Sequence, residues 1–330
     1  MNVVFIVPTG IGAEIGGHSG DATPAAKLIA SLCNKLFTHP NVVNASDINE
    51  MTENMLYIEG SILDRFLEGQ IGLQEVYNNR ILLAINSPVK PEIVNAVSAA
   101  RVTMGADIEI VEFETPIKMV AWVIRKASGD IYNLDEAIQQ VSQYDFDVLV
   151  VNTPIETKDD DVMNYLVRDG GINIWGGVEA KLSKLMSMKL NKPVIHAPVE
   201  NSEVFKAFNE IVDPRKAAEM VSICYLHCCL KGAHVAPEIS LKDNAYWNSD
   251  IDFLISPMNV FGRPHVACVK AGIPIIEVEE NRTVLNDDMP SSVIIAKNYL
   301  EAAGIVSAKK AGVSLSSVRR PLRKTKIEML

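Results

Sequence analysis

Apolar runs of strand length alternate along this chain with polar loops and with stretches of helical periodicity. Residues 3–7, 80–86 and 148–153 are continuous apolar or nearly apolar runs, and a polar loop follows each of them. Such runs are typical of strands that are buried on both faces. Residues 90–104 and 133–144 place apolar side chains at three- and four-residue spacing, as amphipathic helices do. The order of strand, loop and helix predicts βαβ units and a mainly parallel sheet.

This pattern predicts an α/β protein in which mainly parallel sheets are flanked by helices. We expect a Rossmann-like fold of two α/β halves with a cleft between them. The first half would span residues 1–145 and contain a glycine-rich loop, and the second would span residues 146–308. Residues 157–177 have no clear periodicity and are predicted to form a lid or an insertion between the two halves. Residues 309–330 would form a basic C-terminal tail.

The first predicted strand ends at a loop with five glycines between Gly10 and Gly20. Glycine lets a backbone approach a ligand closely, and Glu14, His18 and Asp21 place acid/base groups beside it. Thr23 and Pro24 then predict the N-cap and first turn of a helix that extends to about residue 37. The free backbone N–H groups at that helix start favour a carboxylate or phosphate near the loop.

Ligands of open α/β sheets bind beyond the carboxyl ends of the strands, so the loops at those ends contain the candidate site. We predict that His18 transfers protons and that Glu14 or Asp21 orients its ring. The second polar loop, residues 38–50, and several strand ends would recognise the substrate. The predicted substrate-binding residues are Thr9, Gly10, Gly12, Gly16, Gly17, His39, Asn44, Ser46, Asp47, Glu59, Asn86 and His196.

Composition indicates a folded protein, because 48% of the 330 residues are hydrophobic and 22% are charged. The five cysteines are an odd number without the spacing of a disulfide scaffold, which fits a reducing compartment. The chain contains neither a cleavable targeting segment nor an uninterrupted apolar stretch long enough to span a bilayer. We therefore expect a cytoplasmic protein that does not bind membranes.

Charge is distributed unevenly along the chain. The formal net charge is −10, yet residues 309–330 carry +6, which leaves −16 for the rest. An acidic body disfavours general nucleic-acid binding, because it repels the phosphate backbone. We expect a small-molecule ligand and a homo-oligomer. The tail could be a solvated extension, dock on an acidic neighbouring subunit, fold over an anionic ligand or contact nucleic acid.

The glycine-rich loop matches neither common nucleotide-binding fingerprint. A G-x-G-x-x-G motif starting at Gly10 requires glycine at position 15, where Ile15 stands, and no Walker-type motif exists. The identity of any cofactor therefore stays unknown. A zinc site at His227, Cys228 and Cys229 is disfavoured, because neighbouring residues of a helix point about 100° apart and cannot all face one ion without distortion. A divalent metal at Asp21, Asp47 or Glu59 remains an alternative, and we assign no metal ligands.

Three strings resemble the uncharacterised DUF3326 family and together suggest kinship over most of the chain. They are Pro-Thr-Gly-Ile-Gly-Ala-Glu-Ile-Gly-Gly-His (8–18), Thr-His-Pro-Asn-Val-Val-Asn-Ala-Ser-Asp-Ile-Asn-Glu (38–50) and Ile-Glu-Val-Glu-Glu-Asn (276–281). The resemblance implies no activity. Our hypothesis is a cytosolic enzyme of lyase, isomerase or hydrolase type that acts on a small polar, anionic metabolite by general acid/base chemistry. The alternatives are a non-catalytic metabolite-binding or regulatory protein and a metal-dependent enzyme.

Overall fold

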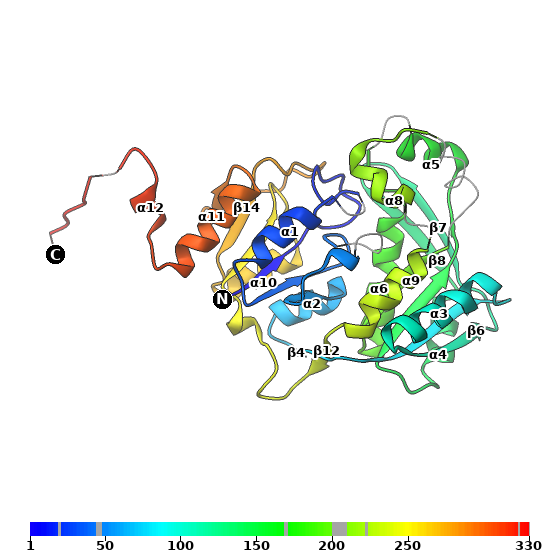
Figure 1. Ribbon diagram of the computed structural model, residues 1–330. Helices are drawn as coiled ribbons and strands as arrows, with labels where there is room; N and C mark the ends of the chain where they lie inside the picture. Colours follow the sequence, from blue (N-terminus) through cyan, green and yellow to red (C-terminus); the bar gives the residue numbers. More distant parts are fainter. Residues whose placement is uncertain are drawn as a thin grey trace.

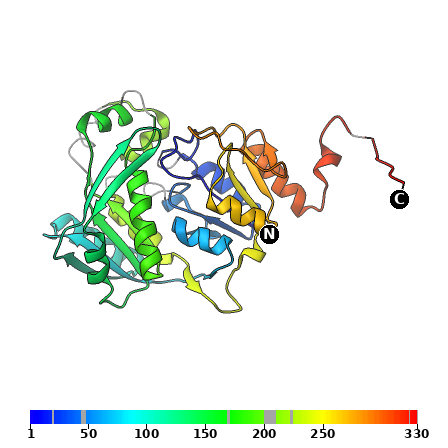
Figure 2. The ribbon, with the colours of Figure 1, turned by 180° about the vertical axis from the view of Figure 1, so that it is seen from behind.

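The protein is built on two parallel sheets that lie side by side, each with helices on both faces (Figures 1 and 2). The computed structural model describes residues 1–18, 21–43, 48–167, 171–199, 210–221, 224–322 and 324–329. The predicted fold class, α/β with mainly parallel sheets flanked by helices, is confirmed.

The larger sheet has six strands, all parallel to their neighbours. Their order is β15 (Ile294–Ala296), β14 (Ile275–Val278), β13 (Phe253–Pro257), β1 (Asn2–Phe5), β2 (Lys35–Thr38) and β3 (Met55–Tyr57). Numbered along the chain, these strands stand in the order 6-5-4-1-2-3, which is the doubly wound Rossmann order. The switch in strand order lies between β1 and β13, so the glycine-rich loop follows the strand at the switch point.

The continuous apolar run in β1 reflects burial on both faces of this sheet. Val3 and Phe5 pack with helices α1 (Thr23–Ala30) and α11 (Tyr299–Lys310). Val4 and Leu254 pack on the opposite face with α2 (Gly60–Leu67) and α10 (Arg263–Ala271). Both faces of β1 are therefore closed to solvent, as the sequence pattern predicted.

The second sheet has four parallel strands and is also covered on both faces. Its order is β11 (Val194–Pro198), β9 (Val148–Thr153), β5 (Arg80–Asn86) and β6 (Asp107–Phe113). Leu83 of β5 packs toward α3 (Pro91–Met104) and α9 (Tyr225–Val235). Leu82 packs on the other face with α4 (Leu134–Val141) and α6 (Gly176–Leu190).

Two small sheets and several short helices complete the described structure. The three-stranded sheet contains β10 (Ile155–Glu156), β7 (Lys118–Val123) and β8 (Ala127–Tyr132). The antiparallel pair β4 (Gly72–Gln74) and β12 (Glu238–Ser240) lies where the chain passes between the two large sheets. The short helices are η1 (Ile48–Glu50), α5 (Asp159–Leu166), η2 (Pro214–Lys216), α8 (Ala217–Val221), η3 (Asn248–Asp250) and α12 (Leu315–Val318).

The helix predicted from Thr23 to about residue 37 is shorter than expected. It ends at Ala30, and Lys35–Thr38 forms β2 at the side of β1. Leu36 is buried because it lies in β2. Its position happens to continue the helical spacing of the preceding apolar residues, which led to the longer helix in the prediction. The N-cap is Ala22 and makes no side-chain cap hydrogen bond, so the predicted cap at Thr23 is wrong by one position.

The two large sheets pair distant parts of the chain. The six-stranded sheet combines strands from both ends of the chain, and the four-stranded sheet takes β5 and β6 from before residue 145 and β9 and β11 from after it. The sheets therefore do not follow a division at residues 145 and 146, because β1 hydrogen-bonds to β13 and β5 to β9. The predicted lid region contains α5 and the first residues of α6.

The chain leaves the body of the protein after α11, and the last residues extend away from both sheets (Figure 1). Arg319 still contacts the body through Glu301, at 2.8 Å between Nη2 and Oε1. Across the described part of the chain, no helix combines the length and the apolar character that crossing a membrane requires.

Candidate functional site

A cavity of about 420 Å³ lies where strand ends of both large sheets meet. Thr9 follows β1, His39 follows β2 and Glu59 follows β3, and all three line the cavity. From the four-stranded sheet, His196 and Pro198 of β11 line the opposite side. Helices α2, α6 and α10 all begin at this cavity, so their positive ends are directed toward it.

The cavity brings together only some of the predicted site residues. Thr9, His39, Glu59 and His196 line it. The remaining described candidates are not among its lining residues, and these are Gly10, Gly12, Glu14, Gly16, Gly17, His18, Asp21 and Asn86. Asn44, Ser46 and Asp47 lie outside the described residues, and so does the predicted approach of His18 to Asn44 and Asp47.

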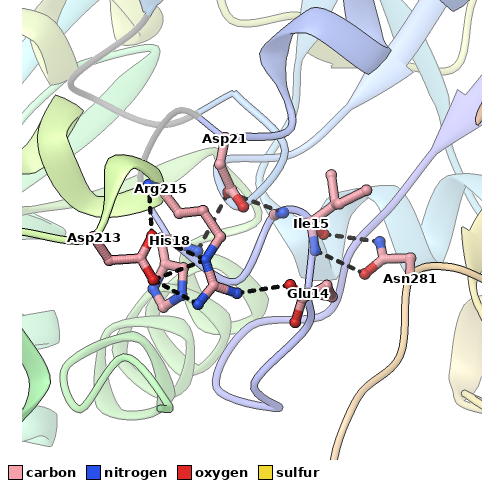
Figure 3. Close-up of polar contacts among 8 residues, drawn as sticks. Glu14, Ile15, His18, Asp21, Asp213, Arg215 and Asn281 are labelled. Carbon is pink, nitrogen blue, oxygen red and sulfur yellow. Dashed lines mark hydrogen bonds and ion pairs between the residues drawn. The ribbon is translucent and has the colours of Figure 1, made fainter. Parts of the chain in front are cut away.

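The glycine-rich loop is a compact turn that side chains fasten from several directions (Figure 3). The Oδ1 atom of Asp21 accepts hydrogen bonds from the backbone N–H groups of Gly16 at 2.9 Å and His18 at 3.4 Å. Asn281 binds both backbone groups of Ile15, at 2.9 Å to the N–H and 2.8 Å to the carbonyl. The carboxylate of Glu14 points outward and pairs with Arg215 at 3.0 Å.

Gly16 is required by the packing of this loop. Its φ of +83° lies in the left-handed region, and a Cβ atom there would lie 2.9 Å from Cγ2 of Val7. The loop therefore folds back onto the residues that follow β1. At this position, the need for glycine comes from the protein's own packing.

His18 is buried, and its ring partner is Tyr165 of α5. The hydroxyl of Tyr165 donates to Oε2 of Glu219 at 3.2 Å, so its oxygen must accept the proton from Nδ1 of His18 at 2.8 Å. Burial lowers the pKa of His18 to about 4, with Arg215 and Lys216 adding to the shift. The ring is therefore neutral near pH 7, with Nδ1 protonated.

Neither acid predicted to orient His18 does so in the structure. Glu14 pairs with Arg215, and the carboxylate of Asp21 binds backbone N–H groups. Asp21 instead turns onto the backbone of its own loop, and Tyr165 contacts the His18 ring. Through Tyr165, His18 connects to Glu219, which lines the cavity and also accepts a hydrogen bond from Asn173 at 3.3 Å.

Asp21 is a buried carboxyl group with one unpartnered oxygen. Burial raises its pKa to about 7, against the opposing effect of the backbone hydrogen bonds from Gly16 and His18. Its Oδ2 atom is buried and has no hydrogen-bond partner in the structure as described. A protonated carboxyl group fits this position better than an ionised one.

Both ring nitrogens of His39 and of His196 contact other atoms of the protein. Nε2 of His39 faces the N–H of Val7 and Nδ1 faces the N–H of Asn41, each at 3.2 Å, and burial lowers its pKa to about 4. A neutral ring accepts at only one nitrogen, so one of these contacts is a hydrogen bond at a time. His196 contacts Glu179 at 2.9 Å and Thr153 Oγ1 at 3.2 Å.

Two other predicted residues have structural partners. Glu59 is the N-cap of α2 and accepts from the backbone N–H groups of Ser61 at 2.8 Å and Ile62 at 3.1 Å. Burial raises its pKa, opposed by these hydrogen bonds. Asn86 binds both backbone groups of Ile117, at 2.7 Å and 2.9 Å, at the end of β5. Its amide fastens the chain between β6 and β7.

A scan against family models matches residues 2–319 to the model described as a protein of unknown function, DUF3326. The chain belongs to the DUF3326 family. It is similar to an uncharacterized lipoprotein of Synechococcus sp. (strain ATCC 27144 / PCC 6301 / SAUG 1402/1), with 32% identity over 335 residues. That match covers 95% of this chain and 92% of the relative.

In this DUF3326 protein the cavity also contains charged residues that sequence reasoning missed. Asp64 of α2, Lys184 of α6 and Arg263 of α10 line it together. All three lie on helices, where charged residues usually face solvent, and no motif distinguishes them. Only the helix starts after Glu59 and Gly262 could have indicated that these residues lie near strand ends.

The metal sites that the sequence left as alternatives were His227 with Cys228 and Cys229, and Asp21, Asp47 or Glu59, of which Asp47 lies outside the described residues. Within the described ranges, no group of three or more His, Cys, Asp or Glu side chains is arranged to hold a metal ion. Cys228 and Cys229 lie on α9 and form no disulfide with a described residue. Nε2 of His227 is buried and has no hydrogen-bond partner among the described residues, and burial lowers the pKa of the ring.

Proposed function

We propose that this DUF3326 protein is an enzyme that acts on a small polar, anionic metabolite by general acid/base chemistry of lyase, isomerase or hydrolase type. The observation that carries the proposal is the cavity at the strand ends of both sheets, lined by ionisable groups from both. Its size suits a metabolite, and its position is where α/β folds place ligands. The helix starts and the side chains of Lys184 and Arg263 favour an anion.

The residues that connect His18 to the cavity supply one candidate for proton transfer. Glu219 lines the cavity, and Tyr165 and Asn173 donate hydrogen bonds to its carboxylate. In this proposal Glu219 exchanges a proton with the substrate, because Glu219 lines the cavity and His18 and Tyr165 do not. His18 does not contact the substrate in this proposal. It orients the hydroxyl of Tyr165 through its ring nitrogen Nδ1.

A panel of small metabolites, followed by NMR for both binding and conversion, tests the proposal. We expect wild-type protein to convert at least one anionic member. Glu219→Gln should lower kcat by about 100-fold or more, the usual range for losing a general acid or base. Tyr165→Phe should give a smaller loss with little change in KM. The matched control is Tyr77→Phe, since Tyr77 is exposed and is not one of the residues that line the cavity.

Two outcomes would contradict this assignment. If a ligand binds in the cavity and is always recovered unchanged, the protein is a metabolite-binding or regulatory protein. If conversion occurs and Glu219→Gln retains full kcat, another cavity residue transfers the proton.

We further propose a cytoplasmic homo-oligomer. None of the five cysteines forms a disulfide with a described residue, which is what a reducing compartment would produce. The Synechococcus relative is named a lipoprotein, which suggests the competing location. Cell fractionation with intact-mass measurement distinguishes them, because unmodified chain in the soluble fraction supports the cytoplasm and lipid-modified chain in the membrane fraction contradicts it. Light scattering on the purified chain then tests the oligomer.

A further inference from the structure

Among the described residues, four carboxyl groups line the cavity, and protein donors hold three of them. Glu59 caps α2, Glu179 binds His196, and Glu219 accepts from Tyr165 and Asn173. Asp64 differs, because its carboxyl group accepts no hydrogen bond from any described residue. Its nearest charged partner is Arg263, with 3.9 Å between Oδ2 and Nη1. Asp64 is therefore the cavity carboxylate with both oxygens available to a ligand.

Asp64 lies at the boundary between the two large sheets. It belongs to the second turn of α2, and its side chain is 19% exposed. Lys184 approaches from α6, which covers the other sheet, and α2 and α6 are in contact. Arg263 begins α10 on the same side as α2. Three helices from both parts of the molecule thus build this corner of the cavity.

Two cationic groups near Asp64 are available to an anion. The side chain of Arg263 binds Glu68 through Nε at 2.5 Å and Nη2 at 2.7 Å, which leaves Nη1 on the side of Asp64. Lys184 makes no hydrogen bond or ion pair within the part of the chain that the structure describes, and it lines the cavity. Its ammonium group can therefore approach whatever occupies the space near Asp64.

We propose that Asp64 is the base that removes a proton from a small carboxylic acid, at a carbon next to a carboxylate or carbonyl group, while Lys184 and Arg263 bind that group. This inference rests on the proposed function and names its substrate class. A carboxylate with two cations nearby suits a reaction in which negative charge develops on the substrate beside the base. The cations stabilise that charge without rearranging.

The proposed step is a single proton transfer. An oxygen of Asp64 forms a bond to the proton as the C–H bond breaks, and the electron pair of that bond moves onto the substrate as an enolate. Lys184 and Arg263 Nη1 balance the new negative charge on the enolate oxygens. Glu219, the proton-transferring group of the proposed function, then gives a proton to the enolate. Water returns Glu219 and Asp64 to their starting protonation states, so the cycle needs no oxidant, reductant or further reactant.

The electrostatics of Asp64 agree with this role. Burial raises its pKa to about 6, against the opposing effect of Arg263 and Lys184. At pH 7 to 8 the group is still mainly ionised, and it is a stronger base than an ordinary aspartate. The rate should therefore fall as the pH decreases through about 6, since protonated Asp64 cannot accept a proton.

The test is deuterium exchange in D2O, followed by proton NMR, with 2-oxobutanoate, 2-oxoglutarate and malate as probes. Wild-type protein should exchange the proton next to the carboxylate or carbonyl group of at least one probe. Asp64→Asn should lower exchange and kcat by about 100-fold or more with KM within about threefold, and the acidic limb of the pH profile should disappear. Asp64→Glu should recover part of the exchange. Asp243→Asn, in an exposed turn outside the cavity, should match wild type.

Substitution of the cations separates binding from chemistry. Lys184→Gln should raise KM by about tenfold, and Lys189→Gln, on the exposed end of the same helix, should leave KM unchanged. Equal exchange by wild type and folded Asp64→Asn overturns the inference. So does conversion of a metabolite from the larger panel without exchange of any acid probe, which leaves the proposed function standing. Wild-type protein that converts no metabolite overturns both.

Discussion

At the scale of single residues, His18 shows why neighbours in sequence are poor guides to partners in a site. Its ring is held by Tyr165, 147 residues away, and Glu14 and Asp21 make other contacts. The loop that contains His18 was a sound candidate, because glycine content and strand position are local features. The partner was not predictable, because α5 reaches the loop only through the packing of the two sheets.

Asp21 gives a prediction about stability and pH. Burial raises its pKa to about 7 from the ordinary 3.8 of an aspartate. Between these pH values the native state therefore holds a proton that the unfolded state has lost. The free energy of unfolding therefore falls as pH rises through this window, by at most about 1.4 kcal/mol per pH unit. Asp21→Asn should remove this slope, since asparagine keeps the Oδ1 acceptor for Gly16 and His18.

Urea unfolding of wild type and Asp21→Asn between pH 4 and 7 measures this difference directly. The lowered pKa of His18 has the opposite effect, because it makes the free energy of unfolding rise with pH below 6.5. Both proteins contain His18, so this effect cancels in the comparison. Asp243→Asn provides the exposed control. Parallel stability curves for wild type and Asp21→Asn would contradict the assignment of a protonated Asp21.

At the scale of elements, the local sequence pattern identified most strands and helices. It failed where one helical spacing of apolar residues ran through both a helix and the strand that follows it. Residues 23–37 carry helical spacing throughout, yet β2 begins at Lys35. The strand forms there because Leu36 and Phe37 are buried on opposite faces of the sheet beside β1. This tertiary pairing overrides the local helical preference.

Two glycines provide a matched pair of predictions for element stability. Gly16→Ala adds a Cβ atom 2.9 Å from Val7 at a φ of +83°, so we expect a loss of about 2 kcal/mol. Gly304→Ala lies in the exposed middle of α11 with no heavy atom within 4 Å, so we expect a gain of about 0.5 to 1 kcal/mol. Chemical denaturation measures both. A neutral Gly16→Ala would show that the loop does not require glycine there.

At the scale of the whole molecule, the two ends of the chain combine to build one sheet. β1 lies between β13 and β2, so the first strand of the chain is completed by residues that follow it by about 250 positions. The chain between β3 and β13 contains the entire four-stranded sheet. The cavity forms where the second sheet meets the strand ends of the first.

This arrangement predicts how truncation acts. A chain ending at residue 247 loses β13 to β15 and leaves β1 without one neighbour, whereas β5 and β9 keep theirs. Hydrogen exchange should show loss of protection in β1 to β3 and retained protection in β5 and β9. A chain ending at residue 319 keeps all strands and is the control. Full protection of β1 in the shorter chain would contradict the dependence of this sheet on both chain ends.

The sequence by itself determined the kinds of elements and the loops from which a site could be built. Apolar runs and helical spacing are local, and the strand-end rule placed Thr9, His39, Glu59 and His196 at what proved to be the cavity. Only the tertiary structure decided which strands are neighbours, and that His18 contacts Tyr165. It alone brought Asp64 and Lys184 together, because such contacts join distant helices through packing that no local pattern records.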